Sequence, residues 1–316
     1  MVPAGVPKRP LSRHQAEDHG LAPLPASPYS SMTTYKLRVE YDGTAYAGWQ
    51  RQPGQPTIQA AIEDALARIT RHPISAVAAG RTDAGVHATG QVVSFRSEKS
   101  LSSFEWTRAL NGILPKDIGI LHTETVDDAF HARYDAHAKI YEYRILNQTT
   151  RPALDRLRVW QIARPLDVDR MRQASCHLLG QHDCTSFQGS PTDVRNPMCT
   201  IQLVHYIQEG PLIRFTIQAD RFLKQMVRAL LGTLVEIGHH KRMPDDLITV
   251  LEARDRRTAG PTAPPQGLYL RHVLYHQEHA RRKDNGDSPQ GHTGAASTQE
   301  HTATVGREDT PGGRSQ

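Results

Sequence analysis

Apolar residues alternate with polar ones over a segment that follows the first thirty or so residues, and this predicts a β-strand with one buried face. The side chains on that face are Tyr35, Leu37, Val39 and Tyr41. A hairpin turn is expected later, where Glu209 and Gly210 separate two alternating segments. The further predicted strands are 76–79, 92–95, 118–126, 139–146, one near Val159, 199–207, 212–219 and 268–275.

Other segments repeat their apolar residues every three or four positions, which predicts amphipathic helices. Several of these segments follow a residue whose side chain can accept hydrogen bonds from the first backbone N–H groups of a helix. In one of them Glu105 follows Ser102 by three residues and completes a capping box. Two predicted helices begin after Thr57 and at Ser102. A third begins after Asp167 and is expected to stop at Gly180. The last two run from Phe222, with apolar positions to Val235, and over 245–254.

Mixed strands and helices place the chain in the α+β class, and we expect two mixed-sheet halves of similar plan. The halves would span 34–148 and 149–276, although the similarity between their sequences is too faint to define a repeat. Residues 1–33 hold six prolines and 277–316 hold almost no aliphatic side chains, so both ends are expected to be disordered tails. Met32 directly precedes the first predicted strand and is a candidate start codon.

The formal net charge of +5 is compatible with an anionic partner but does not diagnose one. The three cysteines form no CxxC pair, and no apolar run is long enough to span a bilayer. We therefore expect a soluble, cytoplasmic protein with free thiols. The histidines show no HExxH spacing, and the glycines form neither a Walker A loop nor GxGxxG after a strand. Metal-dependent and nucleotide-driven chemistry are accordingly disfavoured.

The segment GRTDAGVHA, residues 80–88, lies between two predicted strands and is rich in small residues, which is typical of a loop that approaches another group closely. On residue chemistry alone, a turn with an internal ion pair between Arg81 and Asp83 explains it better than a catalytic site does. The flanking apolar strands favour function, because they would place the carboxylate at the edge of a core, where burial and a cation tune it.

Tyr141 and Tyr143 are two residues apart on a predicted strand and therefore share a face. Such an aromatic face can stack on an unpaired base, but two half-buried core tyrosines would give the same pattern. Arg221, Lys224 and Arg228 have helical spacing and predict a basic stripe on the long helix. Such a stripe is usually a solvated face, and here it could also grip phosphates or point an arginine into a cleft.

Together these segments resemble the TruA-type tRNA pseudouridine synthases. The resemblance covers about three quarters of the chain, and GRTDAGVHA combined with the later FHAR and MVR segments is highly specific. Cys184 departs from the family pattern, which usually has an aromatic residue there. The matching segments, in order, are YDGTAYAGWQRQ, TIQAAIEDAL, AAGRTDAGVHATGQVVSF, FHARYDAHAKIYEYRI, RFLKQMVRALLGTLVEIG and APPQGLYL.

The resemblance implies a pseudouridine synthase fold, with two halves of ferredoxin/RRM-like plan around a basic cleft. It implies conversion of uridines 38, 39 and 40 of the tRNA anticodon stem-loop by a homodimer that needs no cofactor or metal. Asp83 matches the nucleophile, Tyr141 the tyrosine that packs on the target base and Arg81 the arginine beside the nucleophile. Arg228 matches a cleft arginine that pairs with Asp83.

Two other functions compete with this interpretation. A catalytically inactive tRNA-binding protein would bind tRNA without forming product, but the residues around Asp83 that match the family are intact. An unrelated aspartate-dependent hydrolase of small substrates would leave the paired tyrosines and the basic stripe unexplained.

Overall fold

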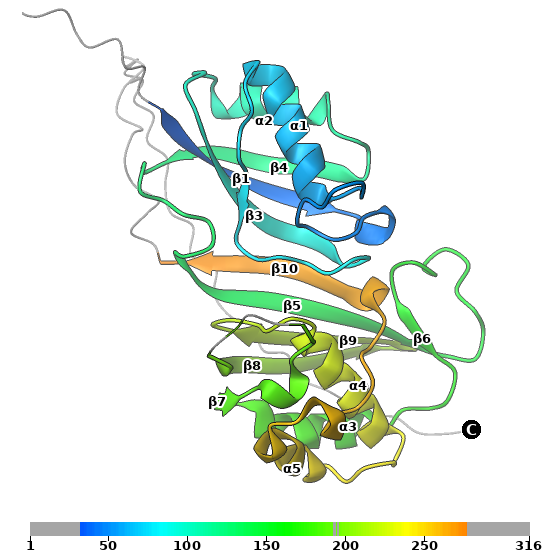
Figure 1. Ribbon diagram of the computed structural model, residues 1–316. Coiled ribbons are helices and arrows are strands. Elements are labelled where there is room, and N and C mark those ends of the chain that lie inside the picture. Colours follow the sequence, from blue (N-terminus) through cyan, green and yellow to red (C-terminus); the bar gives the residue numbers. More distant parts are fainter. Residues whose placement is uncertain (1–31, 192–193, 195, 277–316) are drawn as a thin grey trace, which may run out of the picture. The chain divides into compact units, whose positions relative to one another are not determined.

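The computed structural model describes residues 32–191, 194 and 196–276 (Figure 1). The predicted N-terminal tail lies outside the described residues except at Met32 and Thr33, and Thr33 is already the first residue of the first strand. The predicted C-terminal tail, 277–316, lies outside them altogether.

The described strands form one ten-stranded mixed sheet in the order β4-β1-β3-β10-β5-β9-β8-β7, with β2 beside β3 and β6 beside β5 (Figure 1). Most neighbours are antiparallel, whereas β3 with β10 and β5 with β6 are parallel. The strands are β1 (Thr33–Tyr41), β2 (Val77–Ala78), β3 (His87–Ser97), β4 (Ile118–Val126), β5 (Ala136–Asn147), β6 (Trp160–Ile162), β7 (Gly180–Asp183), β8 (Met198–Glu209), β9 (Leu212–Ala219) and β10 (Leu268–Tyr275).

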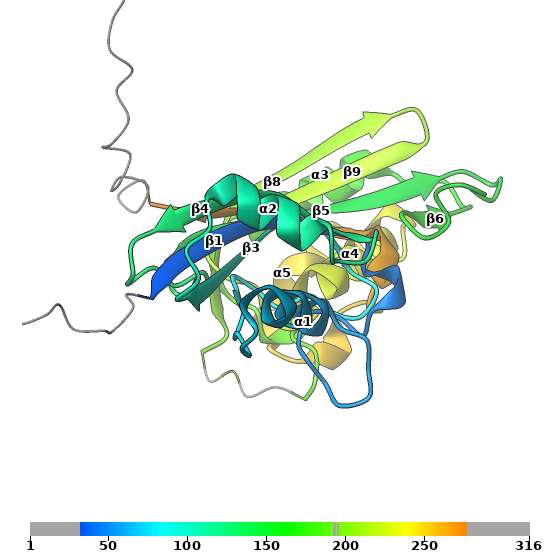
Figure 2. The same cartoon turned by 90° about the horizontal axis from the view of Figure 1, so that it is seen from above.

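The predicted strands are found, and β4, β9 and β10 have the predicted bounds. The hairpin between β8 and β9 is confirmed, with Gly210 at a φ of 57° in its turn (Figure 2). β3 is longer than predicted, because it begins at His87 inside the GRTDAGVHA segment. Gly90 permits this extension, since a Cβ there would lie 2.1 Å from the carbonyl oxygen of Arg271 on β10.

Helix N-termini follow the predicted caps. Thr57 accepts a hydrogen bond from the Ala60 N–H, and Ser102 with Glu105 forms the complete capping box. One helix end differs from the prediction: Gly180 begins β7 rather than stopping a helix, because α3 already gives way to a 3-10 turn at Cys176. The helices are α1 (Ile58–Thr70), α2 (Ser103–Asn111), α3 (Val168–Ser175), α4 (Met226–Gly238) and α5 (Asp246–Ala253).

The predicted start of the long helix was wrong, because α4 begins at Met226 instead of Phe222. Gln225 has a left-handed backbone with a φ of 59°, which interrupts the helix, and the carbonyl oxygen of Lys224 accepts the Gly189 N–H. The predicted basic stripe does not exist as one helical face. Of its three members only Arg228 lies on α4, while Lys224 lies in the turn before the helix and Arg221 in the segment between β9 and that turn.

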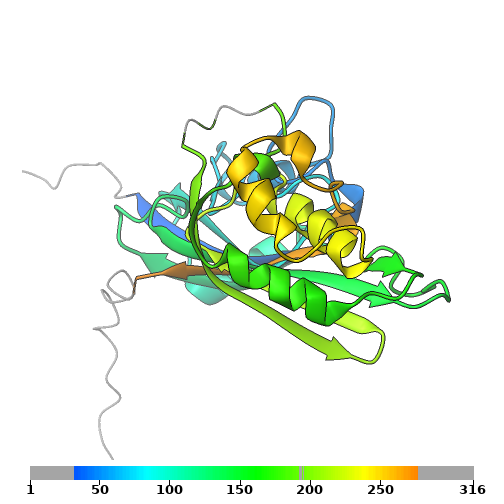
Figure 3. The ribbon, with the colours of Figure 1, turned by 90° about the horizontal axis from the view of Figure 1, so that it is seen from below.

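The larger core cluster lies between the sheet and the helices, and a second, smaller cluster contains Ala79, Val92, Phe130 and Ala132. At the β1 end, the Trp106 ring of α2 packs edge-on against the rings of Tyr35 and Phe95. At the β9 end, α3 packs against α4 (Figure 3). β10 lies between β3 and β5, so strands from both predicted halves join in a continuous sheet, and the boundary at residue 148 stays a prediction.

Candidate active site

The Asp83 loop connects β2 to β3 and is held from both sides by backbone contacts. The Trp49 N–H donates to the Thr82 carbonyl oxygen at 3.0 Å, and the Val86 N–H closes a turn on the Asp83 carbonyl oxygen at 3.1 Å. Gly48 makes the first contact possible: its φ is 94°, and a Cβ would lie 2.6 Å from the Thr82 oxygen. The loop therefore presents the Asp83 carboxylate from a fixed backbone, with 28% of the side chain exposed.

Arg228, in the first turn of α4, reaches this carboxylate. Its Nη1 donates to Oδ2 of Asp83 at 2.9 Å, and its Nε donates to the carbonyl oxygen of Ala263 at 2.7 Å. The Arg228 side chain is only 13% exposed. The contact between two residues 145 positions apart is the one that the family resemblance implied. It also means that Asp83 pairs with Arg228 rather than with Arg81, whose side chain is exposed.

Tyr141 is buried on β5, between Ile217 of β9 and Leu270 of β10. Its ring meets the Phe222 ring edge-on, with centroids 5.0 Å apart. Burial raises the pKa of Tyr141 well above its ordinary value, and the negative charge of Asp83 acts in the same direction. The phenol is therefore protonated at neutral pH and can donate a hydrogen bond.

Tyr143 shares the face of Tyr141 but has a different role. It is fully buried, and its hydroxyl donates to the carbonyl oxygen of Pro264 at 2.7 Å. A Cβ at Gly267 would lie within 2.6 Å of the Tyr143 ring, so the segment before β10 closes over it. The core interpretation is thus correct for Tyr143.

A buried hydrogen-bond chain behind the loop was missed by the sequence reasoning. The Tyr41 hydroxyl is 2.8 Å from Thr82 Oγ1, and Gln91 Nε2 donates to the Gly80 carbonyl oxygen at 2.8 Å and to the Tyr41 hydroxyl at 3.4 Å. Burial raises the pKa of Tyr41 to about 12. These contacts fix the backbone on both sides of Arg81. A polar glutamine within an apolar strand was the available signal, because a buried amide needs partners.

His87, at the start of β3, lies on the opposite face of the sheet. It is 2% exposed; its Nδ1 accepts the Gly43 N–H at 3.1 Å and its Nε2 lies 3.0 Å from the Leu157 carbonyl oxygen. Burial lowers the pKa of His87, although the nearby Asp42 carboxylate opposes this effect. Nδ1 also lies 3.1 Å from Oδ1 of Asp42, so this ring nitrogen faces both a backbone donor and a carboxylate.

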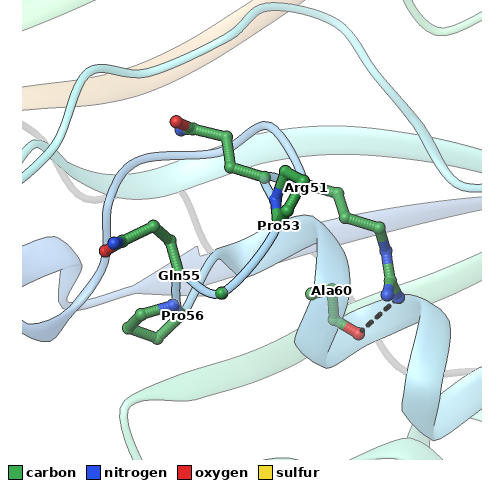
Figure 4. Close-up of a pocket in the computed structure, with 7 residues that line it drawn as sticks. Arg51, Pro53, Gln55, Pro56 and Ala60 are labelled. Carbon is green, nitrogen blue, oxygen red and sulfur yellow. Dashed lines mark hydrogen bonds between the residues drawn. The ribbon is translucent and has the colours of Figure 1, made fainter.

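One hollow on the surface lies away from this chemistry. It is lined by the loop that precedes α1, including Arg51, Pro53 and Gln55 (Figure 4). Arg51 donates to the Ala60 carbonyl oxygen at 3.3 Å and forms ion pairs with Glu63 and with Asp64. Because this cation is already neutralised and none of the predicted site residues lines the hollow, it is not the candidate active site.

Neither a metal site nor a membrane-spanning helix is found within residues 32–191, 194 and 196–276. No cluster of three or more histidine, cysteine, aspartate or glutamate side chains in that part of the chain could hold a metal ion. None of its helices is both long and apolar enough to cross a membrane.

Known proteins share these sequence segments. The family model described as tRNA pseudouridine synthase matches residues 38–135 and 174–276, and the chain therefore belongs to this family of isomerases. The match in two segments agrees with an α+β fold of two similar halves.

Three relatives show how far the similarity extends. The chain is 41% identical over 256 residues to tRNA pseudouridine synthase A of Myxococcus xanthus, an alignment that covers 81% of this chain and 97% of the relative. It is 45% identical over 246 residues to tRNA pseudouridine synthase A of Moorella thermoacetica, covering 77% of this chain and 100% of the relative. For the protein of that name from Wolbachia pipientis the identity is 43% over 243 residues, covering 76% and 99%.

Proposed function

We propose that this protein isomerises uridine to pseudouridine at positions 38, 39 and 40 of the tRNA anticodon stem-loop, with Asp83 as the nucleophile. Family membership supports the reaction and the tRNA substrate. The observation that carries the assignment of Asp83 is its ion pair with Arg228 at 2.9 Å, which orients a partly exposed carboxylate.

The reaction breaks the bond between C1′ of the ribose and N1 of uracil and forms a bond between C1′ and C5. N1 gains a proton and C5 loses one, so atoms and electrons balance without a co-reactant. An ionised carboxylate can start this sequence by attacking C1′, by attacking the uracil ring, or by removing a proton from C2′. All three routes need a charged Asp83, and the Arg228 guanidinium stabilises that charge.

The target uridine has to leave its stack to reach this carboxylate. We infer that the flipped base packs against Tyr141, whose ring is already fixed by Phe222. Arg81 is exposed and precedes the buried Thr82 in the Asp83 loop. Its side chain is therefore available to fill the gap that the flipped base leaves in the RNA stack. A closed pocket would keep the detached uracil in place until it reattaches.

We further propose that the protein acts in the cytoplasm as a homodimer, with tRNA lying across both subunits. The similarity to the TruA-type enzymes supports this assembly. Sedimentation equilibrium of the purified protein, alone and with tRNA, tests it; a monomer in both conditions would refute it.

The decisive test uses Asp83→Asn on purified protein with unmodified tRNA in the absence of added metal. Pseudouridine is mapped by carbodiimide modification and primer extension. We expect product at positions 38–40 with the wild-type protein, none with Asp83→Asn, and similar tRNA affinity for both. Asp64→Asn is the matched control, since Asp64 is an exposed carboxylate paired with Arg51.

Each competing function predicts a different result. A catalytically inactive tRNA-binding protein would bind tRNA without forming product even as the wild type. Residual turnover by Asp83→Asn, with wild-type turnover intact, would remove Asp83 from the nucleophile role.

A further inference from the structure

Lys139 extends from the sheet to the Asp83 loop without being part of the chemistry described so far. It precedes Tyr141 by two residues on β5, so the two side chains project from the same face. A Cβ at Gly80 would lie 3.2 Å from Lys139 Cε, which places the lysine stem against the first residue of the GRTDAGVHA segment. Lys139 is therefore a half-buried cation at the edge of the candidate active site.

The charges around Lys139 are mainly of the same sign. Burial lowers the pKa of Lys139, the positive charges of Arg133 and Arg221 act in the same direction, and only Asp220 opposes them. Arg221 is close because Ala219, two residues before it, is the register partner of Lys139 on β9.

The carboxylate of Asp220 is already engaged. Its Oδ1 accepts the backbone N–H of Thr200 at 2.8 Å and that of Arg221 at 2.7 Å. Among the residues that the structure describes, no carboxylate forms an ion pair with Lys139, Arg133 or Arg221. The guanidinium carbon of Arg133 lies 5.8 Å from the centroid of the Tyr134 ring.

A half-buried ammonium beside two guanidinium groups is unfavourable unless a bound anion balances their positive charges. The substrate supplies such an anion, because every nucleotide of an RNA carries a phosphate close to its ribose. An arginine can also bind a phosphate through two parallel hydrogen bonds, and a lysine through its compact charge.

We propose that Lys139, Arg133 and Arg221 form a subsite for one backbone phosphate adjacent to the flipped uridine. This inference rests on the proposed function, because it takes the ligand to be RNA bound with its target base at Asp83. The subsite holds the RNA backbone at a fixed distance from the Asp83 carboxylate. It acts on position rather than on base identity, because a phosphate contact carries no sequence information.

The test is a thermodynamic cycle between Lys139→Met and single phosphates of an anticodon stem-loop. Each phosphate flanking the target uridine is replaced in turn by an uncharged methylphosphonate, and affinity and kcat/KM are measured for wild type and variant. Lys139→Met alone should lower kcat/KM by about ten-fold to one hundred-fold, as expected for a lost charged hydrogen bond. It should also reduce the slope of log affinity against log salt by about 0.7–0.9.

The cycle identifies the phosphate. One methylphosphonate should weaken Lys139→Met less than it weakens the wild-type protein, because only Arg133 and Arg221 still bind that phosphate in the variant. The other methylphosphonates should act equally on both proteins. Lys241→Met is the matched control. Lys241 is an exposed lysine that follows the C-terminal end of α4, whereas Arg228 lies in the first turn of that helix. This control variant should leave every measurement unchanged.

If Lys139→Met does not fold, as judged by circular dichroism, Arg221→Gln takes its place in the same cycle. Effects that simply add at every phosphate overturn the proposal and leave Lys139 as a packing residue against Gly80. Failure of the proposed function would look different: the wild-type protein would form no pseudouridine, while the binding cycle would still report whether the subsite exists.

Discussion

Replacing Arg228 by methionine removes the contact on which the candidate active site depends. Two hydrogen bonds are lost, from Nη1 to Asp83 at 2.9 Å and from Nε to the carbonyl oxygen of Ala263 at 2.7 Å. A hydrogen bond to a charged group contributes about 1.5–3 kcal/mol. Asp83 is 28% exposed, so water replaces part of the interaction and the lower end of that range applies to folding. We expect the free energy of unfolding to fall by about 2 kcal/mol.

Catalysis should suffer as well, because the water-excluded complex restores the full strength of the interaction. A loss of about 1.5–3 kcal/mol in the transition state lowers kcat by about ten-fold to one hundred-fold. Arg228→Lys retains the charge but cannot make both contacts, so its kcat should lie between those of wild type and Arg228→Met.

The assay follows release of tritium from tRNA labelled at C5 of uridine, because that position loses its hydrogen when the new bond forms. Single-turnover conditions separate the chemical step from product release. A folded Arg228→Met protein whose single-turnover rate stays within about two-fold of wild type would refute the idea that Arg228 orients the Asp83 carboxylate.

Three further substitutions test the surroundings of the site. Tyr141→Phe should lose turnover while tRNA affinity, measured by filter binding, stays near wild type; full turnover would reduce Tyr141 to packing. Gly48→Ala should destabilise the protein by at least about 1–2 kcal/mol in urea denaturation, because alanine is strained at positive φ and its Cβ would collide with the Thr82 oxygen 2.6 Å away; unchanged stability and activity would contradict this geometry. His87 is buried and its pKa is lowered, so the unfolded chain binds more protons and stability should fall as pH drops below about 6.5. His87→Gln should flatten that dependence in denaturation curves between about pH 5 and 7.5, and an unchanged slope would assign the effect to other groups.

Local signals predicted the fold well where a residue acts on its own neighbours. Thr57 and the Ser102–Glu105 pair marked helix starts because their side chains bond to N–H groups three residues away. The start of α4 was predicted too early, since Phe222 has helical spacing but its ring packs on Tyr141 from outside the helix. Periodicity reports which side chains are buried and does not distinguish a helix from a turn that buries the same side chains.

The site was only partly predictable from residue chemistry. Tyr141 and Tyr143 have the same pattern, and only the carbonyl oxygen of Pro264, more than a hundred residues away in sequence, makes one of them a core residue. The pairing of Asp83 with Arg228 likewise depends on tertiary structure, and it was anticipated only through the family resemblance. Residue chemistry alone favoured the nearer Arg81.

The position of β10 has a consequence for biosynthesis. This strand is made last among the described elements, yet it separates β3, which follows the Asp83 loop, from β5, which carries Tyr141. A ribosome-bound chain that ends before Leu268 cannot hold those two strands at their final spacing. The nascent protein would therefore stay inert toward RNA until synthesis is nearly complete, and a premature stop even in the last described strand would abolish activity.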